Sequence, residues 1–269
     1  MSAQFTHLEV FARKGSQWRR SVREILEEAA RKPWAIPHVR NPKNAARLAG
    51  PGLDALLARH DEIVDKVRWV DGRGAVCKIR MDTPTLACAV ASYPMPIADM
   101  MRDQEAAKAC QFFFKDTIDW WRQHVLASGG EPQSVISHVD EAYPHIHLFA
   151  LHPEGPVLAL HPGRSAKRKA FGDALQSGLD RKAANKMGND AYRRAMRLWQ
   201  DDFWEKVGIK HGLTRRGAGK GSMRRGEYLR SKAEQDILTR QRYMLERAAA
   251  EIGVDLDQFL REIATKDAA

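Results

Sequence analysis

The sequence lacks several features that would assign it to a common class at once. Cysteine is scarce: Cys77, Cys88 and Cys110 are 3 of 269 residues, and no short spacing of the kind that holds zinc or frames disulfides joins them. An odd, scattered set is typical of buried thiols in a reducing compartment, so we expect a cytoplasmic protein. No apolar run approaches the ~18 residues that span a membrane. The first residues also lack the charged and then apolar pattern of a signal peptide.

Acidic residues are in the minority as well. The chain has 34 Asp and Glu against 44 Lys and Arg, which gives a formal charge of +10 and a pI near 9.6. Such an excess favours a polyanionic partner, and we predict DNA binding and no membrane contact. A hydrophobic content of 43% suffices for a packed core. The length fits one domain of about 200 residues with an appendage, and we place these at residues 1–221 and 222–269.

Three histidines and two acids stand together between His138 and His147. Residues 140–144 are typical of a turn, because Asp favours turns and Pro cannot join a central ladder. The apolar flanks therefore predict a hairpin, in which His145 and His147 share one face and His138 lies opposite them. Glu141 in the turn can bend over the same point. We predict a site for Mn²⁺ or Mg²⁺, with Zn²⁺ as the alternative.

A hairpin with polar, surface-facing histidines is the competing interpretation of this stretch. A single His-x-His pair would favour that interpretation. Three histidines and two acids around one turn favour a metal site instead.

The pattern His-x-Asp-Glu-x-x-Pro-His-x-His, followed by Leu151-His152-Pro153, resembles the metal motif of plasmid mobilisation relaxases of the MobV/Pre type. These enzymes belong to the single-strand endonucleases named HUH after a His-hydrophobic-His pair, here His145-Ile146-His147. A second stretch, Gly212-Leu213-Thr214-Arg215-Arg216-Gly217 with Lys220-Gly221-Ser222, is similar to the end of their catalytic domain. Together the resemblance covers most of residues 5–230.

The resemblance implies an activity and roles for several residues. His138, His145 and His147 would be metal ligands, and Glu141 would be the acidic member of the site, as ligand or proton acceptor. The enzyme would be a DNA relaxase, active in conjugation and plasmid mobilisation. It would nick one strand at the origin of transfer of a plasmid or mobile element and form a covalent protein–DNA intermediate. Accessory mobilisation proteins would be further partners.

The nucleophile is where the chain departs from this pattern. The resemblance implies a histidine early in the chain, and many other relaxases use tyrosine, but residues 12–32 contain neither. Arginine stands in the matching region, near residues 19–23. We predict His38 as the nucleophile, with His7 as the second candidate and Ser21 as a chemically weaker third.

Basic residues that could hold phosphates fall into three groups. The first lies on a predicted helix, the second follows the hairpin, and the third lies in a glycine-rich stretch at residues 208–225 that has no acid. For the helix, a solvated charged face is the alternative. The predicted DNA contacts are Arg19, Arg20, Arg23, Lys167, Arg168, Lys169, Arg215, Arg216, Lys220, Arg224 and Arg225.

Hydrophobic periodicity predicts the remaining elements. Strands are expected at residues 5–11, 75–81, 85–93 and 157–160, helices at 18–31, 53–67, 103–126, 189–207, 226–250 and 255–264, and a loop at 40–51. Hairpins imply antiparallel pairing. We therefore predict an α+β fold, in which helices cover one side of an antiparallel β-sheet as in the relaxase palm, with a helical C-terminal extension.

Three other functions fit the same residues. The chain could be a non-catalytic single-stranded-DNA-binding relative that retains the metal hairpin and has lost the attacking residue. It could be a rolling-circle replication initiator of the same endonuclease class, or a hydrolase that uses metal-bound water. Relaxases and initiators form a covalent protein–DNA adduct, whereas hydrolases and binding proteins do not.

Overall fold

The structure is a computed structural model that describes residues 2–16, 19–37, 39, 41–70, 74–216 and 249. All elements named below belong to one unit, Met1–Gly217. Apart from residue 249, the expected C-terminal extension lies outside the described residues, as do its boundary after residue 221 and His38, Lys220, Arg224 and Arg225. Within the described ranges, no helix is both long and apolar enough to cross a membrane.

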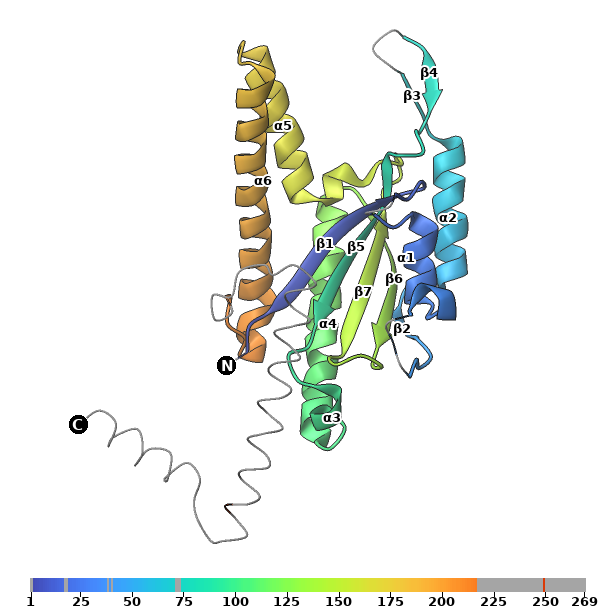
Figure 1. Ribbon diagram of the computed structural model, residues 1–269, viewed down its shortest axis with the longest axis vertical. Coiled ribbons are helices and arrows are strands. Elements are labelled where there is room, and N and C mark those ends of the chain that lie inside the picture. The colour runs from blue at the N-terminus through green and yellow to red at the C-terminus, as the bar shows by residue number, and fades with distance from the viewer. Residues whose placement is uncertain are drawn as a thin grey trace, which may run out of the picture. The chain divides into compact units, whose positions relative to one another are not determined.

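A five-stranded sheet forms the centre of the fold, with the strand order β1-β5-β7-β6-β2 (Figure 1). Every neighbouring pair in it is antiparallel. The predicted α+β class is therefore confirmed. The strands are β1 (Phe5–Ala12), β2 (Ala46–Ala49), β5 (Pro84–Ser92), β6 (Glu131–His138) and β7 (His145–Leu151).

Helices cover both faces of this sheet, so the expectation that they cover one side was wrong. Helix α4 (Gln104–Ala127) packs on one face, and α1 (Val22–Ala29) and α2 (Leu53–Lys66) pack on the other. The reason is visible in β7, where successive side chains point to opposite faces. Ile146 lies in the core under α4, whereas Phe149 lies in the core under α1 and α2.

Three predicted segments differ from the structure. The expected loop at residues 40–51 contains the edge strand β2, which has mainly exposed side chains and so lacks hydrophobic alternation. The expected strand at 75–81 is the short β4 (Val76–Lys78), which pairs with β3 (Arg68–Val70) in a separate ribbon. Residues 157–160 form a 3₁₀ helix because Pro156 and Pro162 flank them and neither can donate to a ladder.

Helix α1 begins at Val22, later than the predicted residue 18, because its N-cap is Ser21. The Ser21 hydroxyl accepts a hydrogen bond from the Glu24 amide at 3.2 Å, and the Glu24 carboxylate accepts one from the Ser21 amide at 2.6 Å. This reciprocal capping box satisfies two amides that would otherwise lack partners. The Ser21 hydroxyl is therefore occupied, which weakens its case as a nucleophile.

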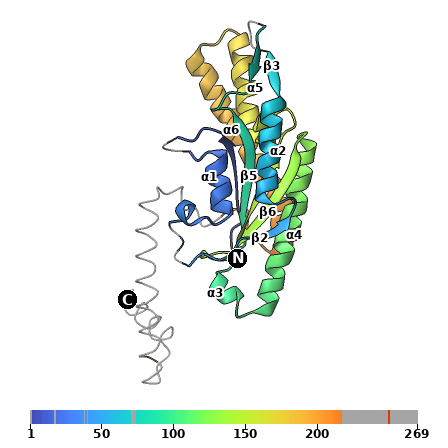
Figure 2. The ribbon, with the colours of Figure 1, turned by 90° about the vertical axis from the view of Figure 1, so that its right-hand side faces the viewer.

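Helices α5 (Pro162–Gln176) and α6 (Arg181–Phe203) form an antiparallel pair that we call the α5–α6 arm (Figures 1 and 2). Small buried residues allow the two helices to approach closely, and a Cβ at Gly188 would lie 3.1 Å from the Lys167 carbonyl oxygen. At the base of α6, Trp199 and Phe203 are buried in the main core, and Met196 packs against it. The sequence predicted α6 from residue 189 onward but did not predict α5, because α5 has few apolar residues and hence little hydrophobic periodicity.

Candidate metal centre

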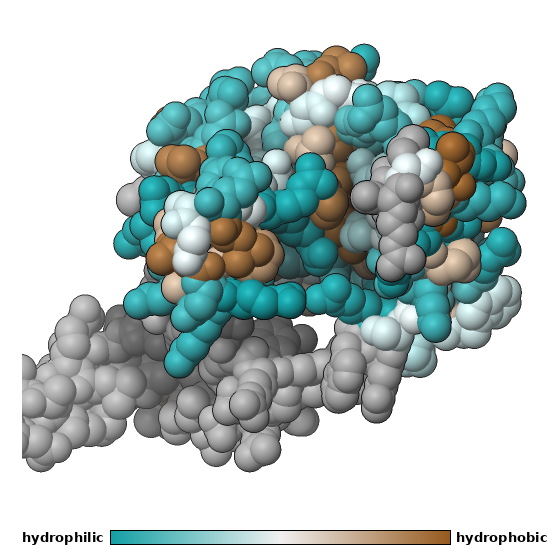
Figure 3. Space-filling view, turned by 90° about the horizontal axis from the view of Figure 1, so that it is seen from above, coloured by the Kyte–Doolittle hydropathy of each residue, from teal (hydrophilic) through white to brown (hydrophobic). Residues whose placement is uncertain are grey.

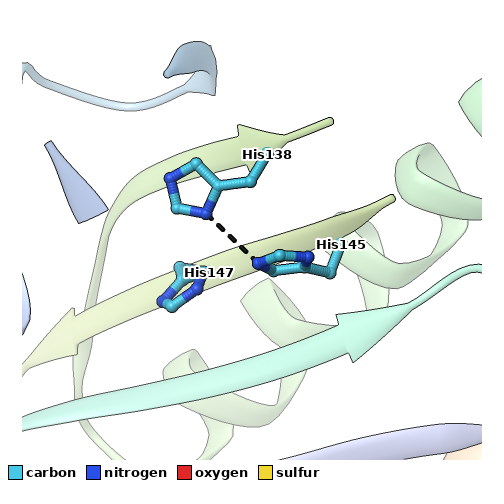
Figure 4. A group of neighbouring side chains, drawn as sticks. All are labelled: His138, His145 and His147. Carbon is cyan, nitrogen blue, oxygen red and sulfur yellow. Dashed lines mark hydrogen bonds between the residues drawn. The ribbon is translucent and has the colours of Figure 1, made fainter. Parts of the chain in front are cut away.

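The structure brings together the three histidines that the sequence singled out (Figure 4). His145 and His147 lie on β7, and His138 ends β6 directly opposite His145 in the register. One ring nitrogen from each lies within 4.8 Å of the others, and all three side chains are buried. The hairpin thus forms a histidine triad on the face that α1 and α2 cover.

Hydrogen bonds fix where two of these rings carry their protons. His138 Nε2 lies 2.9 Å from the Ala29 carbonyl oxygen, and His145 Nδ1 lies 3.1 Å from the Tyr143 carbonyl oxygen. A carbonyl only accepts, so both nitrogens donate and the other nitrogen of each neutral ring carries a lone pair. Those nitrogens, His138 Nδ1 and His145 Nε2, face each other at 3.3 Å, along the dashed line in Figure 4. Two lone pairs that converge in this way fit a bound cation.

Burial keeps the triad neutral. It lowers the pKa of His138 to about 4, lowers the pKa of His145, and lowers that of His147 well below its ordinary value. The Arg31 guanidinium lowers all three pKa values further. Imidazole binds a metal only in its neutral form, so the rings are ready to bind at pH 7 without first releasing a proton.

Two acids in the β6–β7 turn approach the triad differently. The side chain of Asp140 is buried, and its carboxylate accepts hydrogen bonds from Arg31 Nη2 at 2.5 Å and from the Lys43 amide at 3.1 Å. Glu141 Oε1 lies 2.9 Å from Arg31 Nη2 and 3.8 Å from His145 Nε2, the nitrogen with the lone pair. Glu141 is therefore the acid that stands beside the triad, as the resemblance implied. Sequence reasoning placed Asp140 only in the turn and did not identify Arg31.

Among the described candidates for the nucleophile, His7 lies on the same face as the triad. In the sheet register His7 pairs with Val90, and Val90 pairs with His147, so the three side chains share a face. Two strand spacings separate His7 from His147, roughly 10 Å. The His7 side chain is exposed. Tyr93, by contrast, packs against Phe113 in the core under α4, with ring centroids 5.6 Å apart.

Of the predicted DNA-contacting arginines near α1, Arg20 lies close to this centre. Arg20 is one of the charges that lower the pKa of His147, and it also pairs with Glu28. The hydrogen bond with His7 is the main cause of the lowered pKa of Glu9, and the charge of Arg19 lowers that pKa slightly further. Arg23 is exposed on α1. The positive charge beside the triad therefore comes from Arg20, before α1, and from Arg31, after it.

The other described basic candidates lie on the arm and at its base. On α5, Lys167 pairs with Asn189, Lys169 pairs with Asp173, and Arg168 is exposed. Arg216 is also exposed.

The second sequence motif has a structural role in the described part of the chain. Arg215 donates to Asp201 at 2.5 Å, to Gln200 and to the Arg197 carbonyl, and so ties the chain to α6. The neighbouring Thr214 amide donates to the Ser2 carbonyl at 3.0 Å. The motif thus joins the N-terminus to α6. A DNA contact from Arg215 stays a prediction.

Comparisons with known proteins identify the fold. No protein-family model and no curated protein sequence matches the chain. A Mn-bound crystal structure of the MobM relaxase domain (MOBV; Mob_Pre), bound to plasmid pMV158 oriT DNA, matches 86% of this chain and 99% of that chain. The identity is 15% and the TM-score 0.50. A second structure of this domain, bound to 26-nucleotide pMV158 oriT DNA, matches with 14% identity over 83% of this chain and 97% of that chain, at a TM-score of 0.42. The chain has the fold of a MobV-type relaxase domain, as the histidine motif predicted.

Proposed function

We propose that this chain is a metal-dependent, site-specific single-strand DNA endonuclease and strand transferase of the relaxase class. It acts at the origin of transfer of a plasmid or mobile element. The observation that carries the proposal is the pair of facing lone pairs on His138 and His145, with Glu141 beside them. The fold supports it, because the MobM domain with this fold is bound to oriT DNA and to Mn.

We assign His138, His145 and His147 as the metal ligands and Glu141 as the acidic group of the site. Three imidazole nitrogens and one carboxylate favour Mn²⁺ or Zn²⁺ over Mg²⁺, which prefers oxygen ligands alone. When bound, the metal supplies positive charge that polarises an oxygen of the scissile phosphate. The Ala29 and Tyr143 carbonyls hold two of the rings in the tautomers that binding requires.

The strand transfer balances as a displacement at phosphorus. A neutral histidine nitrogen attacks, the bond from phosphorus to the 3′-oxygen breaks, and the 3′-oxygen leaves as a hydroxyl after taking a proton. The 5′-phosphate stays on the protein, so the attack of a 3′-hydroxyl on the adduct reverses the step and rejoins the strand. Because the attacking ring must be neutral, adduct formation should rise with pH through the ordinary His pKa near 6.5.

A covalent adduct assay tests this function and identifies the nucleophile. With Mn²⁺ and an oligonucleotide that is labelled at its 3′ end and single-stranded at the scissile site, the wild type should become covalently labelled, because the protein keeps the fragment that lies 3′ of the nick. We expect His38→Phe to abolish the labelled band and His7→Phe to leave it intact, since His38 is the predicted attacker. Both changes remove a ring nitrogen and keep an aromatic ring, so each is the control for the other.

Other outcomes would change the assignment. If His7→Phe alone abolishes the adduct, the exposed histidine on β1 is the nucleophile and the assignment of His38 is wrong. An adduct that survives both changes excludes both histidines. No adduct from the wild type, together with tight DNA binding, would favour the non-catalytic binding relative, whose main support is the absence of His and Tyr from residues 12–32.

We propose that the α5–α6 arm carries much of the DNA-binding surface, together with Arg19, Arg20, Arg23 and Arg216. Residues 162–203 contain ten Lys or Arg and five Asp or Glu, so half of the chain's formal charge of +10 lies on the arm. Seen from above, the described part of the molecule presents a mostly hydrophilic face with scattered apolar patches (Figure 3). On the arm, Leu175 and Leu179 are exposed apolar side chains. A long basic helix pair of this kind suits the phosphate backbone of a duplex.

The salt dependence of DNA binding tests whether the arm contacts DNA. The triple change Lys167→Gln, Arg168→Gln and Lys169→Gln should lower the slope of log affinity against log salt by about 2 to 3, since each duplex phosphate contact contributes about 0.9. Fluorescence anisotropy on an oriT-like hairpin measures the slope. The matched control changes Lys66, Lys108 and Lys115, on α2 and α4, to Gln and alters the net charge equally. An equal change in slope for both triple variants would exclude a specific role for the arm.

A further inference from the structure

Arg31 occupies a position that is unfavourable for folding. Its backbone φ is 58°, and among the described residues it is the one non-glycine residue with positive φ. Its guanidinium is buried, and the Nε and Nη1 atoms have no hydrogen-bond partner among those residues. A left-handed arginine with a buried charge and unsatisfied donors does not add to stability, and such features concentrate at functional sites.

The left-handed turn at Arg31 places two groups against the β6–β7 turn. Two residues earlier, at the end of α1, the Ala29 carbonyl accepts the His138 Nε2 proton. Arg31 Nη2 then donates both to Asp140 at 2.5 Å and to Glu141 at 2.9 Å. One short segment thus contacts a histidine of the triad and both acids of the turn.

The bridge from Arg31 gives the two adjacent acids different roles. Asp140, whose side chain is 1% exposed, neutralises the buried guanidinium and also accepts the Lys43 amide. Glu141, whose side chain is 35% exposed, points one oxygen both at Arg31 and toward the lone pair of His145. Since Asp140 cancels most of the charge of Arg31, the ion pair can hold Glu141 without strongly repelling a cation at the triad.

We propose that Arg31 is a positioning residue of the metal centre, which acts by holding the Glu141 carboxylate beside the histidine triad. This inference rests on the proposed metal site. Loss of an outer-shell partner typically weakens metal binding 10- to 100-fold. The rival explanation is that Arg31 only fastens the turn to α1, in which case its removal would act on stability and not through Glu141.

Calorimetric Mn²⁺ titrations of the full chain separate the two explanations. The double variant Arg31→Asn, Asp140→Asn removes both charges without leaving a buried carboxylate unpaired, and Asn tolerates the left-handed conformation. We expect Mn²⁺ affinity to fall at least about tenfold while the thermal midpoint stays unchanged or rises. In a Glu141→Ala background, the same double change should alter the affinity less than twofold. Lys32→Gln, an exposed charge change one residue away, is the control and should have no effect.

Each other outcome is decisive. Equal losses of affinity with and without Glu141, or no loss in either background, would overturn the positioning role. If the double variant does not fold, Arg31→Lys replaces it, since this variant keeps the charge and loses the planar guanidinium. If Arg31→Lys lowers the Mn²⁺ affinity at least threefold when Glu141 is present and does not lower it in the Glu141→Ala background, the positioning role is supported. An unchanged affinity would overturn it. A wild type that binds no Mn²⁺ would instead refute the proposed metal site, and the role of Arg31 with it.

Discussion

Replacement of His147 by alanine is expected to weaken Mn²⁺ binding more than about 100-fold, because loss of an outer-shell partner alone typically costs 10- to 100-fold. His147 supplies one of three nitrogens that lie within 4.8 Å of one another, and its ring is almost wholly buried. A water molecule cannot replace the ring without bringing polar groups into the core beside Phe149. Calorimetric titration of wild type and variant with Mn²⁺ measures the effect.

His152→Ala is the matched control for this experiment. His152 follows β7 in the same segment, but it lies outside the triad, and its Nδ1 accepts the Glu154 amide. Its removal should leave the Mn²⁺ affinity within a factor of two. Tight binding that survives His147→Ala would show that the metal sits elsewhere. Loss of binding in both variants would point to unfolding rather than to a lost ligand.

The second large effect is on stability: Phe113→Ala should lower the free energy of unfolding by about 3–5 kcal/mol. Phe113 is fully buried where α4 meets both the sheet and the base of the arm. Its ring contacts Tyr93, Phe203 and His211, with centroids 5.4 to 6.3 Å apart. Removal of the Phe113 ring leaves a cavity. The neighbouring rings cannot fill it, because they belong to three separate segments of the chain. Urea unfolding followed by circular dichroism measures the change.

The neighbouring Phe112 provides the control, because it lies on the same helix and is 64% exposed. Phe112→Ala should change stability by less than about 0.5 kcal/mol, the usual range for a surface substitution. If the two variants lose similar amounts, the assignment of the α4 face that packs on the sheet is wrong.

Sequence patterns predicted the elements whose ends are set by adjacent residues. Strand β5 and helix α4 lie within one residue of their predicted bounds, because Pro94 follows the strand and Asp103 caps the helix. Strand β2 was not predicted, since its exposed residues become a strand only through pairing with β6. Helix α5 was missed for a related reason: contact with α6, rather than an apolar face of its own, explains its helical form.

In the candidate site, too, the residues that are close in the sequence could be predicted and the distant one could not. The triad could be predicted because its three residues lie within one hairpin, where strand alternation alone gives their directions. Arg31 could not be predicted, since 109 residues separate it from Asp140 and no pattern marks an arginine that ends a helix in the left-handed conformation. The contribution of Glu141 was predicted from the motif, but the group that holds it was not.

The strand order has a consequence for how the site assembles. In the five-stranded sheet, β6 and β7 are the only sequence neighbours that pair, whereas β1 pairs with β5 and β2 pairs with β6 across long stretches of chain. Closure of a short loop loses less entropy than closure of a long one, so local pairs can form early in folding. The hairpin that carries the histidine triad is thus the pairing of this sheet that can form first. A metal ion bound at that stage would favour the correct register of the hairpin before the edge strands β1 and β2 pair with the sheet.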